Sequence, residues 1–248
     1  MRRQFDIIVY NSEKGTPSVE DPALGWFFVQ NISEAIPALD AEWVLIAHPG
    51  AHIDRPFLNA IADVTLDFPF ADGFAPWIVD AGVPDKVIDS GMLLRKGIGG
   101  IPEFTGKIQR HYLKLIAAPS PYLAIFSKRL LTSTGGFDTM FRSGKARFFD
   151  LGLRALHAGA KLYSLPGKPA IAIPFKEPLN TKEIQNEIAA GIYKNLGLSD
   201  LYSYVWRHPG VIPYLVRNRK RLDAESLRIT ELSTFTDKLK ADVSAAGK

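Results

Sequence analysis

The chain has 248 residues, 46% of them hydrophobic, and its 30 Lys and Arg against 26 Asp and Glu give a formal net charge of +4. This length supports one substantial hydrophobic core, and the absence of cysteine excludes disulfides and thiolate metal sites. No run approaches the roughly 20 apolar residues of a membrane span, and the N-terminus predicts a strand rather than a signal peptide. We therefore expect a cytoplasmic protein, with contact at the inner membrane surface left open. The weak basic balance suits anionic ligands.

Three short apolar runs near the N-terminus predict buried strands. They comprise residues 5–10 (FDIIVY), 26–30 and 43–47 (WVLIA). Helix signals lie between and after these runs. Asn31 or Ser33 can cap a helix that ends near Leu39, and Pro56 stands at an early helix position, where its missing N–H costs nothing.

The alternation of strands and helices predicts an α/β fold, a mixed and mostly parallel sheet flanked by helices. Sheets of this kind bind ligands beyond the carboxyl ends of their strands. That rule points to Asn11, to residues 48–54 and to the turn after an expected strand near Tyr122.

The middle and the end of the chain carry weaker signals. We expect strands around residues 77–79 and 92–94, and a lid or connector at the glycines of 97–100. Residues 180–193 predict an amphipathic helix. From residue 201 to 248 the composition shifts to aromatic and basic residues, which favours a helical C-terminal extension.

The stretch from 122 to 166 is the most informative. It predicts a strand, a short helix, a Gly-Gly-Phe-Asp turn, a loop, a second helix ended by Gly159 and a last strand. Asp138 after the two glycines can cap a short helix or orient a hydroxyl group. Asp150 favours a helix N-cap, and Arg154 lies one turn further, where it can pair with Asp150.

This order resembles the acceptor-side half of the inverting, family-2-type glycosyltransferases, which have the GT-A fold. The matching residues are Gly135, Gly136, Phe137, Asp138, Phe141, Asp150, Leu151, Arg154 and Gly159. Upstream, Tyr10-Asn11 and the segment from Trp43 align with the end of the family's first strand and with its Asp-x-Asp region. The resemblance implies a GT-A-like domain over residues 1–200.

The resemblance implies transfer of a hexosyl-type sugar from a nucleotide-sugar donor to a saccharide or glycoconjugate acceptor, as in bacterial polysaccharide biosynthesis. It implies catalytic roles for Asp138 and Asp150. The implied donor-binding residues are Tyr10, Asn11, His48, Gly50, His52 and Asp54. The implied acceptor-binding residues are Gly136 and Phe137. Arg147, in the basic loop before the second helix, is assigned to the acceptor as well, and its positive charge suits either a diphosphate or an anionic acceptor.

Three positions depart from the family's pattern. The two metal-binding aspartates fall on His48 and Gly50, and the general base falls on Phe148. Mn²⁺ or Mg²⁺ on a diphosphate prefers carboxylate ligands, and phenylalanine cannot accept a proton. The missing Asp-x-Asp pair therefore argues against a metal cofactor.

The spacing of His48 and His52 keeps several roles open. The two histidines can form a substitute metal site, contact phosphate directly or face solvent. Two functions remain compatible with these residues: an enzyme with a rebuilt site, or a catalytically degenerate protein that serves as a saccharide-binding or scaffolding subunit.

Residues 202–221 mix aromatic side chains with arginines. This composition is compatible with peripheral membrane contact, with a partner interface and with packing onto the core. The positive charge is local and no recognition motif accompanies it, so we expect no nucleic-acid partner.

Overall fold

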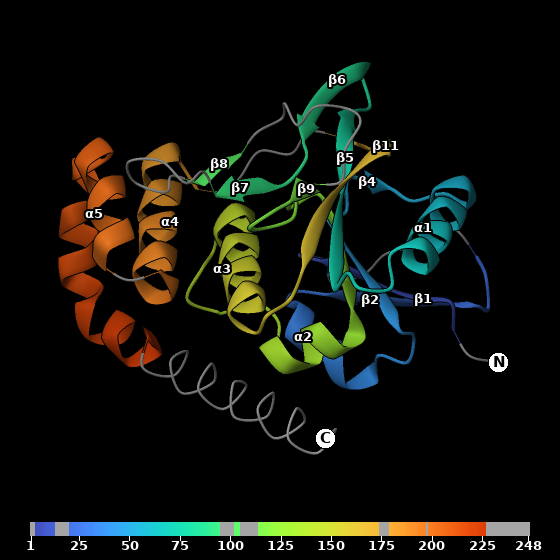
Figure 1. Ribbon diagram of the computed structural model, residues 1–248, viewed down its shortest axis with the longest axis horizontal. Helices are drawn as coiled ribbons and strands as arrows, with labels where there is room; N and C mark the ends of the chain where they lie inside the picture. Colours follow the sequence, from blue (N-terminus) through green and yellow to red (C-terminus); the bar gives the residue numbers. More distant parts are fainter. Residues whose placement is uncertain are drawn as a thin grey trace, which may run out of the picture.

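The computed structural model describes residues 3–12, 20–94, 102–104, 114–173, 179–196 and 198–226. Its centre is a mixed sheet in the order β2-β1-β3-β10-β5-β11-β4, with β6 beside β5 and β9 beside β11 (Figure 1). The strands of this sheet are β1 (Phe5–Tyr10), β2 (Leu24–Val29), β3 (Trp43–Ala47), β4 (Ala51–His52), β5 (Gly73–Asp80), β6 (Val83–Asp89), β9 (Lys114–Leu115), β10 (Leu123–Ser127) and β11 (Leu162–Ala172). A separate hairpin pairs β7 (Met92–Leu94) with β8 (Pro102–Phe104).

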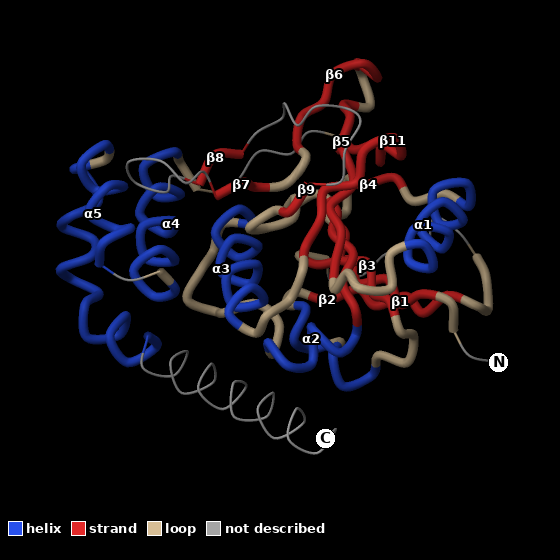
Figure 2. The backbone as a smooth tube through the Cα atoms, in the orientation of Figure 1, coloured by secondary structure: helices blue, strands red, loops and turns tan. Residues whose placement is uncertain are grey.

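Helices cover both faces of the sheet (Figure 2). They are α1 (Arg55–Asp67), α2 (Lys128–Thr134), α3 (Gly144–His157), α4 (Thr181–Asn195) and α5 (Leu198–Arg207), with 3-10 helices η1 (Ile32–Glu34), η2 (Ile36–Ala38) and η3 (Pro209–Val211). Residues 212–226 are also helical. The predicted α/β fold, a mixed sheet flanked by helices, is confirmed. The loop expected at 97–100 lies outside the described residues.

One strand runs opposite to the expectation. Strand β10 pairs antiparallel with both β3 and β5, while β1, β2 and β3 are mutually parallel. The turn after β10 therefore lies at the far edge of the sheet. The residues just before β10, from Ser120 to Tyr122, reach the carboxyl ends of β1 and β3 instead, where the His48 amide donates to the Tyr122 carbonyl at 2.9 Å.

Two expected helices differ in form. The segment after Asn31 makes two 3-10 turns instead of one α-helix, and Pro37, which lacks an N–H, lies in the second of them. Asn31 does cap the first turn, as predicted. The helix predicted to open at Asp150 begins at Gly144, because the Ser143 hydroxyl accepts the Ala146 amide as its N-cap.

Other local predictions are confirmed within a few residues. Helix α1 begins at Arg55 with Asp54 as its N-cap, and Pro56 stands in its first turn. Helix α4 begins after Asn180 in a capping box with Glu183. The strand expected at 26–30 occupies Leu24–Val29.

Three apolar clusters build the interior. One joins α1 to the sheet, a second joins the opposite face of the sheet to α2 and α3, and a third joins α3 to α4 and α5. Helix α3 is therefore buried on two sides, in agreement with its central place in Figure 1. Among the described helices, none is long and apolar enough to cross a bilayer.

Helical periodicity explains how α3 contributes to two apolar clusters and also presents charged side chains. Phe148, Leu151 and Ala155 share one face and pack toward the sheet. Ala146, Phe149 and Leu153 share another face and pack toward α4. A third stripe is polar, and its members are Arg147, Asp150 and Arg154. This stripe faces the residues that form the candidate site.

Candidate functional site

The site lies where the parallel strands β1 and β3 end. Tyr10 closes β1, and Asn11 follows with φ 55°, the left-handed region that asparagine tolerates better than most residues. Asn11 is the one non-glycine residue with positive φ in the described part of the chain. His48 follows β3 directly. The structure thus brings two donor residues implied by the resemblance to one edge of the sheet, as predicted.

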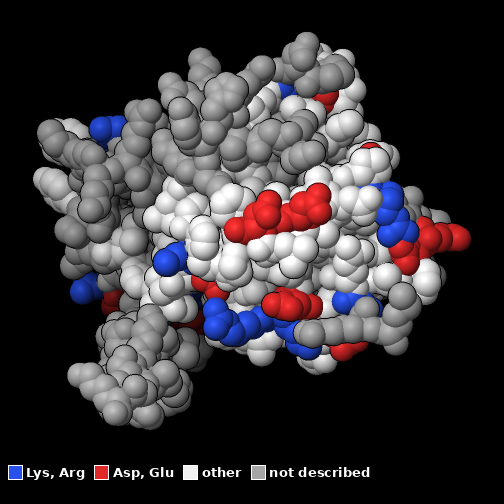
Figure 3. All heavy atoms as spheres, turned by 45° about the vertical axis from the view of Figure 1, so that its right-hand side comes forward, with Lys and Arg blue, Asp and Glu red and all other residues white. Residues whose placement is uncertain are grey.

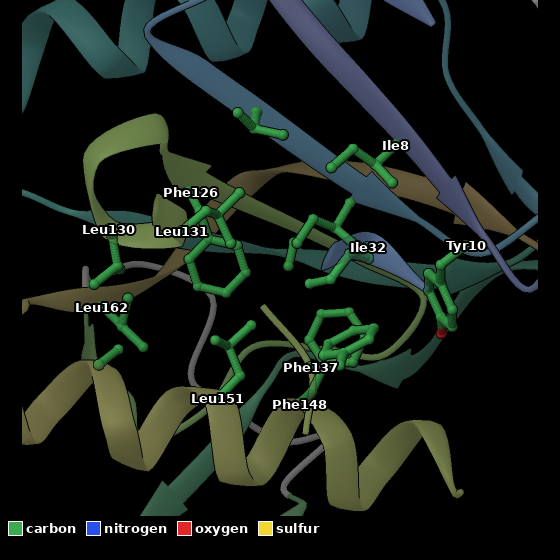
Figure 4. Close-up of a cluster of buried hydrophobic side chains, with 14 of the residues drawn as sticks. Ile8, Tyr10, Ile32, Phe126, Leu130, Leu131, Phe137, Phe148, Leu151 and Leu162 are labelled. Atoms are coloured by element: carbon green, nitrogen blue, oxygen red, sulfur yellow. The ribbon is translucent and has the colours of Figure 1, made fainter. Parts of the chain in front are cut away.

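An aromatic cluster forms the base of this site. The Tyr10 ring meets His48, Phe137 and Phe148 at centroid distances of 5.9, 5.7 and 5.7 Å. Phe137 and Phe148 lie 4.9 Å apart in an edge-to-face arrangement, as Figure 4 shows. The Tyr10 hydroxyl donates to the Pro121 carbonyl. Phe148, at the position of the family's general base, is therefore a fully buried core residue.

Arg147 connects the two halves of the site. Its Nη1 donates to Asn11 Oδ1 at 3.2 Å, and its Nε donates to the Phe141 carbonyl at 2.8 Å. The guanidinium carbon lies 5.9 Å from the centre of the Phe137 ring, a cation–π distance. The sequence predicted Arg147 beside the acceptor. The structure places its side chain at the end of β1, beside a predicted donor residue.

The Gly-Gly-Phe-Asp turn has the backbone that the sequence predicts. Gly135 and Gly136 have φ of 73° and 80°, which glycine adopts without strain. Asp138 closes a turn by accepting the Met140 amide at 2.7 Å, and no helix follows it, so its predicted role as a helix cap is wrong. Phe137 points into the aromatic cluster, which ties this turn to β1.

A buried ion network lies behind that turn. Lys194 Nζ is 2.6 Å from Asp138 Oδ2 and 3.1 Å from Asp150 Oδ1. Arg154 Nε donates to Asp150 at 2.7 Å and its Nη2 donates to the Gly136 carbonyl at 2.6 Å. The predicted pairing of Arg154 with Asp150 is confirmed. The predicted N-cap role of Asp150 is wrong, because Asp150 lies in the middle of α3 with 0% of its surface exposed.

The network controls the acidity of Asp138. Burial by itself would raise the pKa of this carboxyl, but the hydrogen bonds from Lys194 and Met140 and the charges of Lys194 and Arg154 hold the pKa below its ordinary value. A carboxylate stabilised in this way binds a proton poorly. Asp138 is therefore suited to accepting hydrogen bonds and poorly suited to removing a proton.

The residues at the Asp-x-Asp position do not fit a divalent metal. His48 Nδ1 accepts the Gly50 amide at 3.2 Å, and burial lowers the pKa of His48. The His52 side chain is 59% exposed, and its Nε2 is 3.8 Å from Asp54 Oδ2. No three metal-ligating side chains gather anywhere in the described ranges. Because Mn²⁺ and Mg²⁺ prefer several carboxylate oxygens, the predicted metal role of His48 and His52 has no donor set around it.

The sequence analysis missed the partners on α4. Glu187, Gly191, Lys194 and Asn195 share the face of α4 that meets α3, and Asn195 Nδ2 donates to Asp150 Oδ1 at 3.0 Å. Glu187 accepts the amides of Arg142 and Ser143 before α3. Helix α4 is amphipathic and carries polar side chains on several faces, so its periodicity did not single out these four residues.

Asp89 is a second missed acid. It is 5% exposed, accepts the Gly91 amide at 2.8 Å and bonds to the Ser120 hydroxyl, and burial raises its pKa. Ser120 begins the segment that reaches the carboxyl ends of β1 and β3. Asp89 therefore fixes the wall of the site beside Pro121, the residue that Tyr10 contacts.

A pocket of about 790 Å³ lies at the opposite edge of the sheet. Its walls include Trp43 at the start of β3, Phe70 and Asp72 before β5, and Arg129 after β10. Arg129 and Asp72 form an exposed ion pair there at 2.8 Å. Parallel strands present ligands at their carboxyl ends, so we place the candidate site at Asn11 and His48.

The mixed sheet flanked by helices matches the GT-A fold of solved glycosyltransferase structures. No protein-family model and no curated protein matches the chain.

Two solved structures define this likeness. GalNAc-T7 with UDP, GalNAc and Mn²⁺ has a TM-score of 0.52 at 10% identity, over 90% of this chain and 54% of that one, so this chain spans about half its length. Residues 1–349 of S. aureus TarS in complex with UDP-GlcNAc have a TM-score of 0.51 at 12% identity, over 100% of this chain and 93% of that fragment. At these identities the likeness establishes the fold.

Proposed function

We propose that the protein is a glycosyltransferase-like protein that binds a nucleotide-sugar donor and a saccharide or glycoconjugate acceptor. The observation that carries the proposal is the position of Arg147 on α3, where it donates a hydrogen bond to Asn11 at the end of β1 and lies over the Phe137 ring of the glycine turn. Donor and acceptor residues implied by the resemblance meet there. The two GT-A neighbours hold UDP and UDP-GlcNAc, which supports a nucleotide-sugar as the ligand class.

The chemistry that this site can perform decides between two forms of the function. Transfer with inversion needs a group that takes the proton of the acceptor hydroxyl. Asp138 lies on the acceptor turn, but its ion pair with Lys194 opposes that role. Phe148 offers no proton acceptor. These two observations favour, as a second candidate, a protein that binds saccharide and nucleotide without transferring sugar, as a subunit of polysaccharide biosynthesis.

Thermal unfolding in the presence of UDP-, GDP-, dTDP- and CMP-sugars tests the proposal. A ligand that contributes about 2–3 kcal/mol at saturation raises the melting temperature by several degrees. We expect one nucleotide to stabilise the protein selectively. Equal melting temperatures with all donors, with and without Mn²⁺, would contradict nucleotide-sugar binding. If a nucleotide-sugar does bind, a test for release of free nucleotide in the presence of an acceptor distinguishes a glycosyltransferase from a protein that only binds its ligands.

We also propose a peripheral membrane contact through residues 202–221. Tyr202, Trp206 and Val216 expose 70, 78 and 70% of their surface there. Exposed basic side chains accompany them: Arg207, Arg217, Arg219, Lys220 and Arg221. On the different face drawn in Figure 3, described acidic and basic side chains form small separate groups. Aromatic and basic residues together suit an anionic lipid surface.

Sedimentation with lipid vesicles tests this contact. We expect the protein to bind vesicles rich in phosphatidylglycerol and to remain free with phosphatidylcholine alone, since the basic side chains need an anionic surface. Trp206→Ser should weaken the binding, while Leu66→Ser, a change of an equally exposed residue on α1, should not. Equal binding by both variants would exclude the proposed surface.

A further inference from the structure

Among the described residues, no acidic side chain directly follows the two strands at whose ends a donor diphosphate would bind. Asn11 and His48 follow β1 and β3, and Gly50 stands at the second position of the missing acidic pair. The carboxylate nearest to Gly50 in sequence is that of Asp54, whose Oδ1 already accepts the Phe57 amide as the N-cap of α1. A divalent ion that bridges a diphosphate to a protein needs hard, anionic oxygen ligands. The described residues here do not supply them.

A larger side chain at Gly50 would make one tight contact with the backbone. A Cβ at this position would lie 3.2 Å from the carbonyl oxygen of Ile173 and 3.5 Å from His48 Nδ1. The Gly50 carbonyl accepts the Ile173 amide at 3.0 Å, which holds the two segments together. Position 50 therefore offers no side-chain ligand, and its carbonyl already accepts the Ile173 amide.

A fixed cation does occupy this end of the site. Arg147 is held at three points, by Asn11 Oδ1, by the Phe141 carbonyl and by the face of Phe137. Because these contacts already restrict the side chain, it loses little further conformational entropy when it binds a ligand. A planar guanidinium presents several N–H donors in a fork that matches phosphate oxygens, and it keeps its charge at all physiological pH values. The side chain is partly exposed, so a ligand can reach it.

We propose that the site binds a nucleoside diphosphate without a divalent metal, with the Arg147 guanidinium neutralising the charge that a metal would otherwise neutralise. The inference rests on the proposed function and adds to it the mode of diphosphate recognition. Arg147 is in this view a donor-binding residue, which revises its predicted place beside the acceptor.

Isothermal titration with UDP and GDP, in EDTA and in excess Mn²⁺, tests the inference by binding alone. We expect the dissociation constant of the preferred nucleotide to be nearly the same in both conditions. Arg147→Met should weaken binding about 10- to 100-fold, the range of lost charge-assisted hydrogen bonds. The dissociation constant of Arg147→Lys should lie between those of the unaltered protein and Arg147→Met, because lysine keeps the positive charge but lacks the planar set of N–H donors.

Matched controls separate the outcomes. Arg129→Met removes the same charge at the opposite edge of the sheet, where the side chain is 86% exposed, and should bind as the unaltered protein does. Urea unfolding of Arg147→Met and Arg147→Lys shows that each variant is folded. Binding that requires Mn²⁺, or that survives Arg147→Met, overturns the inference and leaves the proposed function standing. No binding of any nucleotide in either condition overturns both.

Discussion

Lys194→Met is expected to lower the free energy of unfolding by about 3–5 kcal/mol, the cost of leaving a buried charge without its partner. The Lys194 side chain is 2% exposed and contacts carboxylates of Asp138 and Asp150, which are 15 and 0% exposed. Methionine fills a similar volume but leaves Asp138 without its ion-pair partner and Asp150 with Arg154 alone. Equilibrium unfolding in urea measures the loss.

The exposed pair of Arg129 and Asp72 supplies the control. Arg129→Met removes an ion pair of similar length, 2.8 Å, but its side chain is 86% exposed, so the loss should stay below about 1 kcal/mol. Asp138→Asn in the Lys194→Met background should recover part of the stability, since it removes one of the stranded charges. A Lys194→Met protein as stable as Arg129→Met would show that the network does not hold the turn.

The contribution of the same network to the free energy of unfolding should depend on pH. The pKa of Asp138 is lowered in the folded protein, so its contribution to stability is fully present above its ordinary pKa of 3.8 and is lost as pH falls through the folded value. The difference in unfolding free energy between the unaltered protein and Lys194→Met should therefore be largest near neutral pH and should narrow in acid.

Gly152→Ala is expected to destabilise the protein by about 3 kcal/mol or more, the upper end of the range for overpacking. Gly152 lies in the middle of α3, where its missing side chain lets the helix touch the backbone before β10. An alanine Cβ would lie 2.2 Å from the Ala117 carbonyl oxygen and 2.7 Å from the Ala118 Cα. Backbone atoms cannot rotate away as a side chain can, so the helix or the strand must move.

Helix propensity alone predicts that Gly152→Ala raises the free energy of unfolding, so the experiment distinguishes propensity from packing. In an exposed helix, alanine is favoured over glycine by about 1 kcal/mol. Gly191→Ala in α4 is the matched control, because its nearest neighbours are ring atoms of Phe149 at 3.2 and 3.4 Å. We expect that variant to stay within about 1 kcal/mol of the unaltered protein. Thermal and urea unfolding of both variants measure the difference. A neutral Gly152→Ala would mean that α3 lies further from the sheet.

The consequences of Gly152→Ala would extend to the site. Residues 117–118 continue to Ser120 and Pro121, which bond to Asp89 and to the Tyr10 hydroxyl. A shift of this segment would therefore move the aromatic base on which Arg147 lies. We expect the variant to bind nucleotide more weakly than its residual stability alone would account for, and titration at a temperature where it is folded measures this.

Local rules let the sequence predict the parts of this protein that short stretches decide. Residues 5–10 and 43–47 form buried strands because their runs are apolar except for Asp6, whose carboxylate accepts the Asp40 and Ala41 amides. Gly135 and Gly136 adopt positive φ because no other residue does so at so little cost. Asn180 and Asp54 begin helices because their side chains accept backbone amides within three residues.

The same local rules failed where a longer-range contact competed. Asp150 has the chemistry of an N-cap, yet Ser143 takes that role and Asp150 is drawn into the helix by Lys194, Arg154 and Asn195. The direction of β10 was also beyond reach, since an apolar run reads the same in parallel and antiparallel pairing. The order of the family's motifs carries long-range information and predicts both halves of the candidate site, and those assignments stay predictions.

The sequence by itself therefore determined the elements, the glycine turn and the fold class. The tertiary structure decided which charges meet. The Arg147 contact with Asn11 joins residues 136 positions apart, and the Lys194 contact with Asp138 joins residues 56 apart. Such pairs form only when the sheet and the packed faces of α3 and α4 bring them together. The orientation of each helix, and with it the position of its polar stripe, is set by the free energy of burying the apolar faces and not by the attraction between the charges.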